Sequence, residues 1–158
     1  MRHHDVIPSP VGPLLVVTDE GRIVRIAFEA EDHDAVLASL GGSSTPLRLT
    51  AARQQLAAYF AGQLRHFSLP LAGSASGFRS EVLLAVAAVP YGRTVTYTEL
   101  AAATGRPGAV RATGSALGSN PLPIVVPCHR VVRRDGTAGG FLGGPAAKER
   151  LLALEAAA

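Results

Sequence analysis

The first half of the chain alternates short apolar runs with polar turns, a pattern typical of β-strands. Residues 14–18 and 23–28 are two apolar runs, and the segment 19–21 between them, Asp-Glu-Gly, carries the turn chemistry of a hairpin. Alternating apolar positions over 67–71 predict a third strand. The apolar stripe of residues 50–61, which is followed by a glycine, predicts a helix.

The second half of the chain is dominated by helical spacing. Apolar residues recur through 78–89 on nearly every face, Leu84 included, which predicts a buried helix between the two halves of the chain. Thr96 and Glu99 have the spacing of a capping box, in which each side chain satisfies a backbone N–H of the other residue. A short helix over 97–104 is therefore expected.

A turn rich in Gly and Pro at 105–108 separates that helix from a second one that begins at about residue 109. Two short helices joined in this way are typical of a helix-turn-helix, although an ordinary helical hairpin has the same pattern. The second helix is expected to expose Arg111, Ser115 and Gly118 on one face. An arginine among residues with almost no side chain suits close approach to DNA or to a packed neighbouring domain.

The stretch 72–77 consists only of alanine, glycine and serine and is typical of a linker. We therefore expect two domains, residues 1–77 and residues 78–158, in an α/β (α+β) protein. The first domain would hold a small antiparallel sheet with one or two helices. The second would hold a helix-turn-helix of winged-helix-like form and a last helix from about residue 145 to 155.

Basic residues are concentrated in the second expected domain. Residues 1–77 hold six arginines against seven acidic residues, a net charge of −1, whereas residues 78–158 hold nine basic against five acidic residues, a net charge of +4. This excess suits a polyanionic partner such as DNA, but many proteins of similar pI bind no nucleic acid. No membrane-length apolar run and no signal peptide are present, so a cytoplasmic location is expected.

Cys128 is the only cysteine of the chain, and it lies between Pro127 and His129 at the end of an apolar stretch. The thiol is a candidate nucleophile if a base or a positive field activates it, and otherwise a buried, inert side chain. Neighbouring residues of a strand point to opposite faces, so activation by His129 requires a local turn or a bridging water.

Metal chemistry finds little support in the sequence. A lone thiol excludes an internal disulfide and a thiolate-rich zinc site. His3, His4 and His33 are interpreted as exposed terminal and loop histidines rather than metal ligands. We therefore expect neither a metal nor another cofactor.

Glu155 is a further candidate for the site. In the predicted last helix it shares a face with Leu151 and Leu152, so its carboxylate should lean toward the core unless the helix frays first. A buried carboxylate requires an imidazole or an arginine nearby. A relay from Glu155 through His129 and a water to Cys128 would satisfy the carboxylate and orient the imidazole. The alternative is a surface glutamate near a frayed end.

Several spaced motifs together resemble the O6-alkylguanine-DNA alkyltransferases. The match is strong over about residues 78–155 and weak over about residues 11–71. It implies a ribonuclease H-like N-terminal sheet domain in front of the helix-turn-helix. The matching segments, in the order and spacing of that family, are 89–92, 96–101, 111–114, 120–121, 127–132, 139–144 and 148–155.

The resemblance implies that Cys128 accepts an alkyl group directly from O6 of a damaged guanine in double-stranded DNA, once and irreversibly. His129 would take the thiol proton through water while Glu155 holds the imidazole. The target base must be flipped out of the duplex, and Arg111 would fill the vacated stack. Ser115 would be small because this helix lies in the minor groove.

The resemblance also assigns a base pocket. Tyr97 would donate to the guanine ring as charge develops on the leaving base. Carbonyl groups of the cysteine and of Val131 would accept from the exocyclic amine, and the Leu142 amide would donate toward O6. Asn120 would tie the helix end to the cysteine-bearing segment. Phe141 and Leu142 replace an aromatic and a hydroxyl residue common in the family, so the backbone donor survives but a hydroxyl contact does not.

The sequence therefore favours a single-turnover DNA-repair alkyltransferase that acts as a monomer, singly or in several copies along DNA. A non-catalytic winged-helix protein that binds alkylated DNA is the alternative, and a thiol hydrolase is a third function class. A binder would keep its whole activity without Cys128. A hydrolase would turn over acyl or peptide substrates and have no affinity for DNA.

Overall fold

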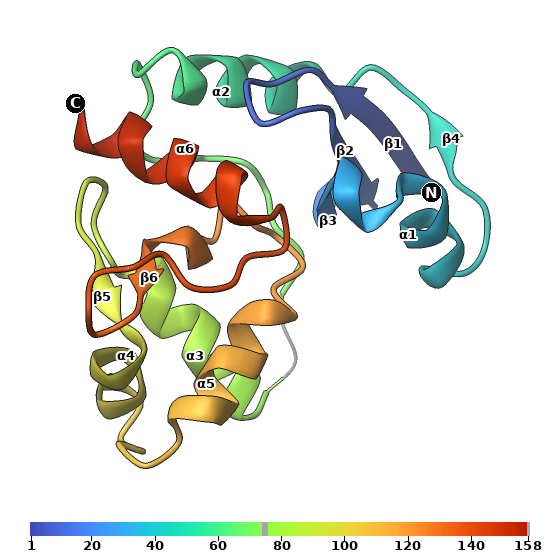
Figure 1. Cartoon of the computed structure of the whole chain (residues 1–158). Coiled ribbons are helices and arrows are strands. Elements are labelled where there is room, and N and C mark those ends of the chain that lie inside the picture. The colour runs from blue at the N-terminus through green and yellow to red at the C-terminus, as the bar shows by residue number, and fades with distance from the viewer. Residues whose placement is uncertain (74–75, 158) are drawn as a thin grey trace. The chain divides into compact units, whose positions relative to one another are not determined.

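The chain divides into two compact units, Met1–Gly73 and Ser74–Ala158. They are seen in a computed structural model that describes residues 1–73 and 76–157 (Figure 1). Residues 74 and 75 of the expected linker lie outside the described residues, and the domain boundary at residue 77 stays a prediction. The predicted mixed α/β fold is confirmed, because the first unit is built on a sheet and the second mainly on helices.

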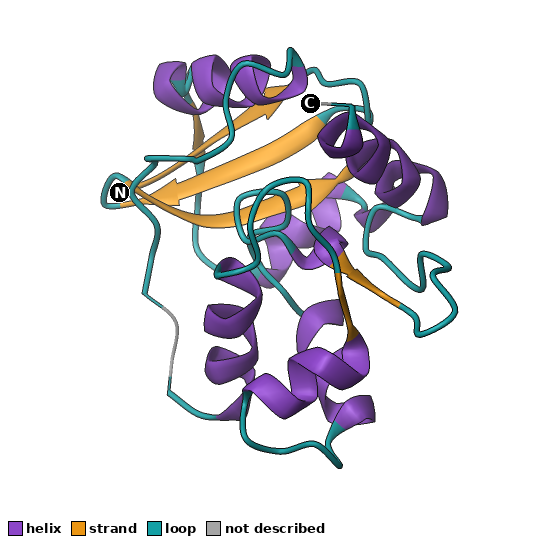
Figure 2. Cartoon of the chain, turned by 90° about the vertical axis from the view of Figure 1, so that its left-hand side faces the viewer, coloured by secondary structure: helices purple, strands orange, loops and turns teal. Residues whose placement is uncertain are grey.

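A four-stranded sheet with the strand order β3-β2-β1-β4 forms the first unit. Figure 2 shows its long strands side by side. β1, β2 and β3 pair antiparallel, whereas β4 pairs with β1 in parallel, so the expected antiparallel sheet has one parallel edge. The strands are β1 (Arg2–Ile7), β2 (Leu14–Asp19), β3 (Arg22–Phe28) and β4 (Thr45–Pro46).

The predicted hairpin is formed by β2 and β3. Asp19 pairs with Arg22, so Glu20 and Gly21 make a two-residue turn in which both have a positive φ, 49° and 77°. Such a turn matches the right-handed twist of the two strands, and glycine adopts it without a steric penalty.

Helices complete the first unit: η1 (Glu29–Glu31), α1 (His33–Ser39) and α2 (Thr50–Phe60). α2 is the helix predicted there, and its stripe is buried at Leu56 and Tyr59. α1 packs on one face of the sheet through a small apolar cluster. That cluster consists of Leu15, Val17, Ala27 and Val36.

Two predictions for the first unit are wrong. Over 67–71 the expected strand is absent, since within the described residues only Leu71 forms an isolated bridge, to Ile23. His3, His4 and His33 are half-buried, the first two inside β1 and the third at the start of α1, and not in exposed loops. β1 itself was not predicted, because its polar side chains give no apolar pattern although its backbone pairs with β2 along its whole length.

The second unit contains the predicted helix-turn-helix, α4 and α5, packed with α3 (Figure 1). The Thr96 hydroxyl caps α4 by accepting from the Glu99 N–H at 3.0 Å. None of the helices in the described part of the chain is long and apolar enough to span a membrane. The elements of this unit are α3 (Phe78–Ala87), β5 (Val95–Thr96), α4 (Tyr97–Ala103), α5 (Val110–Gly118), η2 (Cys128–Arg130), β6 (Val131–Val132) and α6 (Pro145–Ala156).

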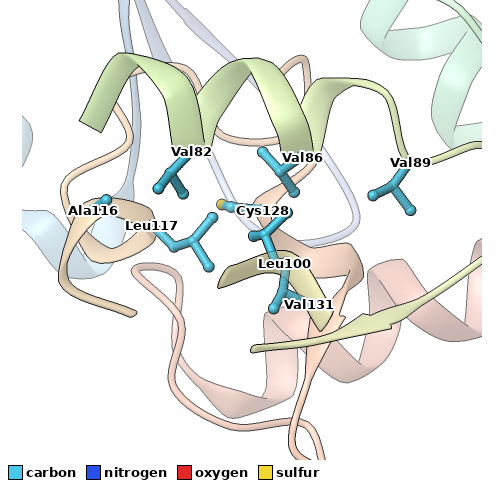
Figure 3. Close-up of a cluster of buried hydrophobic side chains, with 8 residues drawn as sticks. All are labelled: Val82, Val86, Val89, Leu100, Ala116, Leu117, Cys128 and Val131. Carbon is cyan, nitrogen blue, oxygen red and sulfur yellow. The ribbon is translucent and has the colours of Figure 1, made fainter. Parts of the chain in front are cut away.

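An apolar cluster that includes Cys128 forms the core of the second unit (Figure 3). α3 contributes Val82 and Val86 to it, and α5 contributes Leu117. The predicted burial of α3 holds for Val82 and Val86 but not for Leu84, which is 68% exposed. α3 therefore turns one apolar side to this core and leaves another in solvent.

Candidate active site

The side chain of Cys128 lies where the core of the second unit meets a pocket. This residue is 5% exposed, and Figure 3 shows it among Val86, Leu100 and Leu117. The 3₁₀ turn η2 begins at Cys128 and is closed by the Arg130 N–H, which donates to the Pro127 carbonyl at 3.0 Å. The local turn that the sequence required for thiol activation is thus present.

A buried ionic cluster follows Cys128 directly in the sequence. His129 Nε2 lies 2.8 Å from Glu155 Oε2. Arg130 donates to the same carboxylate from Nε at 2.8 Å and from a terminal nitrogen at 3.0 Å, and to the Val89 carbonyl at 2.7 Å. The carboxylate therefore binds both an imidazole and an arginine, the two partners that the sequence allowed. Glu155 is 3% exposed, so it is not a surface residue at a frayed end.

The pKa of His129 is lowered from its ordinary value, chiefly by burial, and the opposing effect of Glu155 does not restore it. The imidazole is therefore neutral at neutral pH. Since Nε2 donates to the carboxylate, Nδ1 is the basic nitrogen. Nδ1 is buried and makes no hydrogen bond to any of the described residues. Such a nitrogen can accept a proton that a water delivers.

Asn120 joins the end of α5 to the segment that leads to Cys128. Its Nδ2 donates to the Val126 carbonyl at 2.9 Å, and its Oδ1 accepts from the Leu122 N–H at 3.0 Å. The residue is 1% exposed, so neither bond competes with solvent. Both ends of the amide are used, which holds the segment in one conformation.

A pocket of about 820 Å³ opens beside Cys128. Four predicted site residues line it, namely Tyr97, Cys128, Phe141 and Leu142, whereas Arg111, Ser115, Asn120 and Val131 do not. Arg111 and Ser115 stand exposed on α5, on the face that the sequence assigned to them. The lining consists of Tyr97, Thr98, Val110, Gly114, Leu117, Gly118, Cys128, Arg133, Arg134, Asp135, Gly140, Phe141 and Leu142.

The sequence interpretation missed the charged wall of this pocket. Arg133 and Arg134 follow β6 directly, in a turn closed by the Arg133 N–H, which donates to the Thr137 carbonyl at 2.9 Å. Asp135 accepts from the Thr137 N–H and hydroxyl. Two adjacent arginines, the first of them four positions after His129, were the available signal.

Tyr97 fits between two glycines. A Cβ on Gly139 would lie 2.9 Å from the Tyr97 hydroxyl oxygen, and a Cβ on Gly114 would lie 4.0 Å from its ring. Gly139 also has a φ of +80°, so only a residue without a side chain lets the loop approach this closely. Burial raises the pKa of Tyr97, so the phenol keeps its proton at neutral pH.

Lys148 was not singled out from the sequence, yet it is fully buried beside Tyr97. Its Nζ donates to the Val131 carbonyl at 2.7 Å and to the Gly140 carbonyl at 3.3 Å, and it lies 3.5 Å from the Tyr97 hydroxyl oxygen. Lys148 precedes Glu155 by two helical turns on the same face of α6, so the spacing that pointed to the glutamate also pointed to the lysine.

The two carbonyl groups expected to bind the exocyclic amine already have internal donors. The Cys128 carbonyl accepts from the Val131 N–H, and the Val131 carbonyl accepts from Lys148. Each carbonyl oxygen has a second lone pair, so an additional donor can bind without breaking these bonds.

Two family models match the chain. The model described as 6-O-methylguanine DNA methyltransferase, DNA binding domain, matches residues 77–157, and the model described as its ribonuclease-like domain matches residues 3–72. The chain belongs to this family. The family predicted from the spaced motifs around Cys128 is thereby confirmed.

Named relatives cover most of the chain. It is 38% identical to the constitutive methylated-DNA--protein-cysteine methyltransferase of Bacillus subtilis, over 90% of this chain and 88% of the relative. It is 39% identical to the methylated-DNA--protein-cysteine methyltransferase of Methanosarcina barkeri, over 97% of this chain and 96% of the relative. The function class predicted from the sequence, an alkyltransferase with a cysteine acceptor, agrees with these names.

Solved structures of the family have the same fold. The O6-methylguanine methyltransferase of Mycobacterium tuberculosis superposes with a TM-score of 0.88 at 36% identity, covering 99% of this chain and 94% of that chain. The same organism's OGT in complex with DNA superposes with a TM-score of 0.85 at 36% identity, covering 98% of this chain and 93% of that chain.

Proposed function

We propose that the protein repairs O6-alkylguanine in double-stranded DNA by moving the alkyl group irreversibly to the sulfur of Cys128, once per molecule. The observation that carries this proposal is that Cys128 lines a pocket while the next residue, His129, is held by the buried Glu155 carboxylate. Membership of the 6-O-methylguanine DNA methyltransferase family supports the same reaction.

The His129–Glu155 pair supports a proton relay to the thiol. An unperturbed thiol has a pKa of about 8.5, so little thiolate exists at neutral pH without a base. A water bound to the buried Nδ1 of His129 would carry the Cys128 proton to the imidazole. Glu155 would stabilise the imidazolium that results, as a carboxylate does in other relays of this type.

The chemical step is a displacement at the alkyl carbon. The Cys128 thiolate forms the new S–C bond as the C–O6 bond breaks, and the bonding electron pair stays with the guanine. Tyr97 donates its proton to the ring, and the Leu142 amide donates to O6. The Cys128 and Val131 carbonyls accept from the exocyclic amine. Because a thioether offers no good leaving group, the protein is consumed.

The target base must leave the duplex to reach Cys128. Arg111 on the exposed face of α5 would take its place in the stack. Ser115 on the same face would allow the helix backbone close to the minor groove. Asn120 would keep this helix and the cysteine segment in register through its two backbone bonds.

DNA is supported as the partner by the DNA complex of the mycobacterial neighbour and by the DNA-binding description of the family model. The basic excess of residues 78–158 fits the same partner. We further propose that the protein acts in the cytoplasm as a monomer, alone or in several copies along the DNA, without a metal or another cofactor.

The function is tested with duplex DNA that carries O6-methylguanine with a labelled methyl group. Label is expected on Cys128, identified by peptide mapping, and at no more than one equivalent per protein. Sustained turnover, or the absence of label on the protein, would sink the proposal. Undamaged duplex DNA with a labelled methyl group on thymine serves as the control substrate.

Replacing Arg111 by alanine is expected to slow repair in duplex DNA by about tenfold or more, because base extrusion costs a few kcal/mol that the arginine would offset. Reaction with the free O6-methylguanine base should keep its rate, since no stack has to be opened. Arg150→Ala, an exposed arginine on α6, removes the same charge and is the matched control. Equal losses on both substrates would remove Arg111 from this role.

A further inference from the structure

Lys148 is a buried charged group that contacts the pocket residues Tyr97 and Gly140, and the alkyl-transfer steps above leave it unused. It is the only lysine among the fifteen basic residues of the chain, and all the others are arginines. Its exposed fraction is 0%, and no carboxylate of the described residues pairs with its ammonium. A buried ammonium without a counter-ion is costly, and an arginine in its place could not release a proton.

The acceptors around Lys148 leave its proton mobile. Two of them are neutral backbone carbonyls, and the third is the Tyr97 hydroxyl at 3.5 Å, the outer limit of a hydrogen bond. Its Nζ also lies 5.7 Å from the centroid of the Tyr97 ring. Burial lowers the pKa of Lys148 to about 8, so the side chain is mostly protonated at neutral pH but releases a proton readily.

Alkyl transfer requires Tyr97 to give up its hydroxyl proton. The phenol is a weak acid here, because burial raises its pKa, and a buried tyrosinate would be unfavourable. If Tyr97 protonates the departing guanine, a second proton delivered to its oxygen removes that penalty. The Lys148 ammonium, which donates to this oxygen at 3.5 Å, is placed to deliver that proton.

We propose that Lys148 is the proton reservoir for Tyr97: as the Tyr97 hydroxyl protonates the departing guanine, the Lys148 ammonium passes a proton to the Tyr97 oxygen. This inference rests on the proposed function. Lys148 does not contact the guanine itself and acts only through Tyr97. Its bonds to the Val131 and Gly140 carbonyls keep it within reach of the phenol.

The step balances in atoms and charge. The Cys128 proton goes to His129 before the attack, and the S–C bond then forms as the C–O6 bond breaks. The electron pair left on guanine takes the Tyr97 proton, and Tyr97 takes one from Lys148. The products are a thioether, a neutral guanine, a neutral tyrosine, a neutral amine and an imidazolium, so the net charge of the site is unchanged.

The groups around Lys148 favour release of its proton during the reaction. A Cys128 thiolate raises the pKa of Lys148, whereas Arg133 lowers it. The charge of Lys148 contributes to the lowered pKa of His129, and Tyr97 is a further titratable neighbour of the lysine. On α6 itself, Glu149 and Arg150 are exposed and Glu155 is paired with Arg130. Alkylation removes the thiolate charge, so the pocket then holds the ammonium less tightly.

A single lysine makes the titration directly observable. With ¹³C-lysine incorporated, the one Cε signal reports the protonation of Lys148, and a midpoint near pH 8 is expected in the full chain. The single-turnover rate with saturating free O6-methylguanine base is measured over the same pH range. The rate should fall about tenfold per pH unit above that midpoint. After alkylation of Cys128, the midpoint should lie lower.

Variants separate proton supply from packing. Lys148→Met should slow transfer by about 10²-fold or more and abolish the alkaline fall. Lys148→Arg keeps the charge but does not titrate in this range, so its slower rate should also lack the fall. In a Tyr97→Phe background, Lys148→Met should cost nothing further. Burial raises the pKa of Tyr97 above its ordinary value, so ionisation of Tyr97 cannot cause a fall in rate that begins near pH 8.

A wild-type rate that is constant through the measured midpoint of Lys148 would overturn the inference, whether or not the variants fold. So would an equal loss from Lys148→Met with and without the Tyr97 hydroxyl. Failure of the underlying function looks different, because then no label reaches Cys128 at any pH. Label transfer with a flat alkaline profile removes only the role of Lys148.

Discussion

Replacing Cys128 by serine is expected to abolish alkyl transfer while duplex DNA is still bound. An alcohol is a far weaker acid than a thiol, so the His129 relay cannot generate the oxyanion, and a hydroxyl is a poorer nucleophile toward alkyl carbon. The change replaces one sulfur atom by oxygen in the core of the second unit and leaves the surface of α5 untouched. Label transfer and affinity for duplex DNA are measured on the same preparation.

Cys128→Ala controls for the new buried hydroxyl, which has to find a partner in an apolar cluster. Both variants should be inactive in transfer and should bind DNA equally well. If the serine variant keeps all measurable activity, the protein is a non-catalytic binder of alkylated DNA. If the wild type instead turns over acyl substrates and does not bind DNA, it is a thiol hydrolase.

Replacing Glu155 by alanine is expected to lower the free energy of unfolding of the second unit by about 3–5 kcal/mol. The change leaves the Arg130 guanidinium buried without its carboxylate and removes the hydrogen-bond partner of His129 Nε2. Transfer to Cys128 should slow as well, because the imidazolium loses the charge that stabilises it. Denaturant titration and the single-turnover rate measure the two effects.

The matched control is Glu149→Ala, an exposed glutamate on the same helix. This change should alter stability by less than about 0.5 kcal/mol, as is usual for surface positions. If both variants unfold at the same denaturant concentration, the ionic cluster around Glu155 does not stabilise the fold. If Glu155→Ala is destabilised but transfers at the wild-type rate, the carboxylate has no part in the relay.

Local signals made much of the fold predictable. The Thr96 cap, the Glu20–Gly21 turn and the buried stripe of α2 each depend on residues within a few positions of one another. β1 was not predictable in this way. Its pairing with β2 is made by backbone hydrogen bonds, and its polar side chains show no apolar pattern that would indicate a strand. The false strand over 67–71 shows the reverse, an apolar alternation that meets β3 only at the isolated bridge between Leu71 and Ile23.

The site divides along the same line. The sequence alone determined three features of the site: the single thiol at Cys128, the neighbouring imidazole and the inward orientation of Glu155. Each of them follows from composition or from helical spacing. Tertiary structure decided that Glu155 binds His129 and Arg130 together, and that Lys148 reaches Tyr97. Those contacts join residues 26, 25 and 51 positions apart, and only the packing of α6 against η2 and the pocket brings them into hydrogen-bond range.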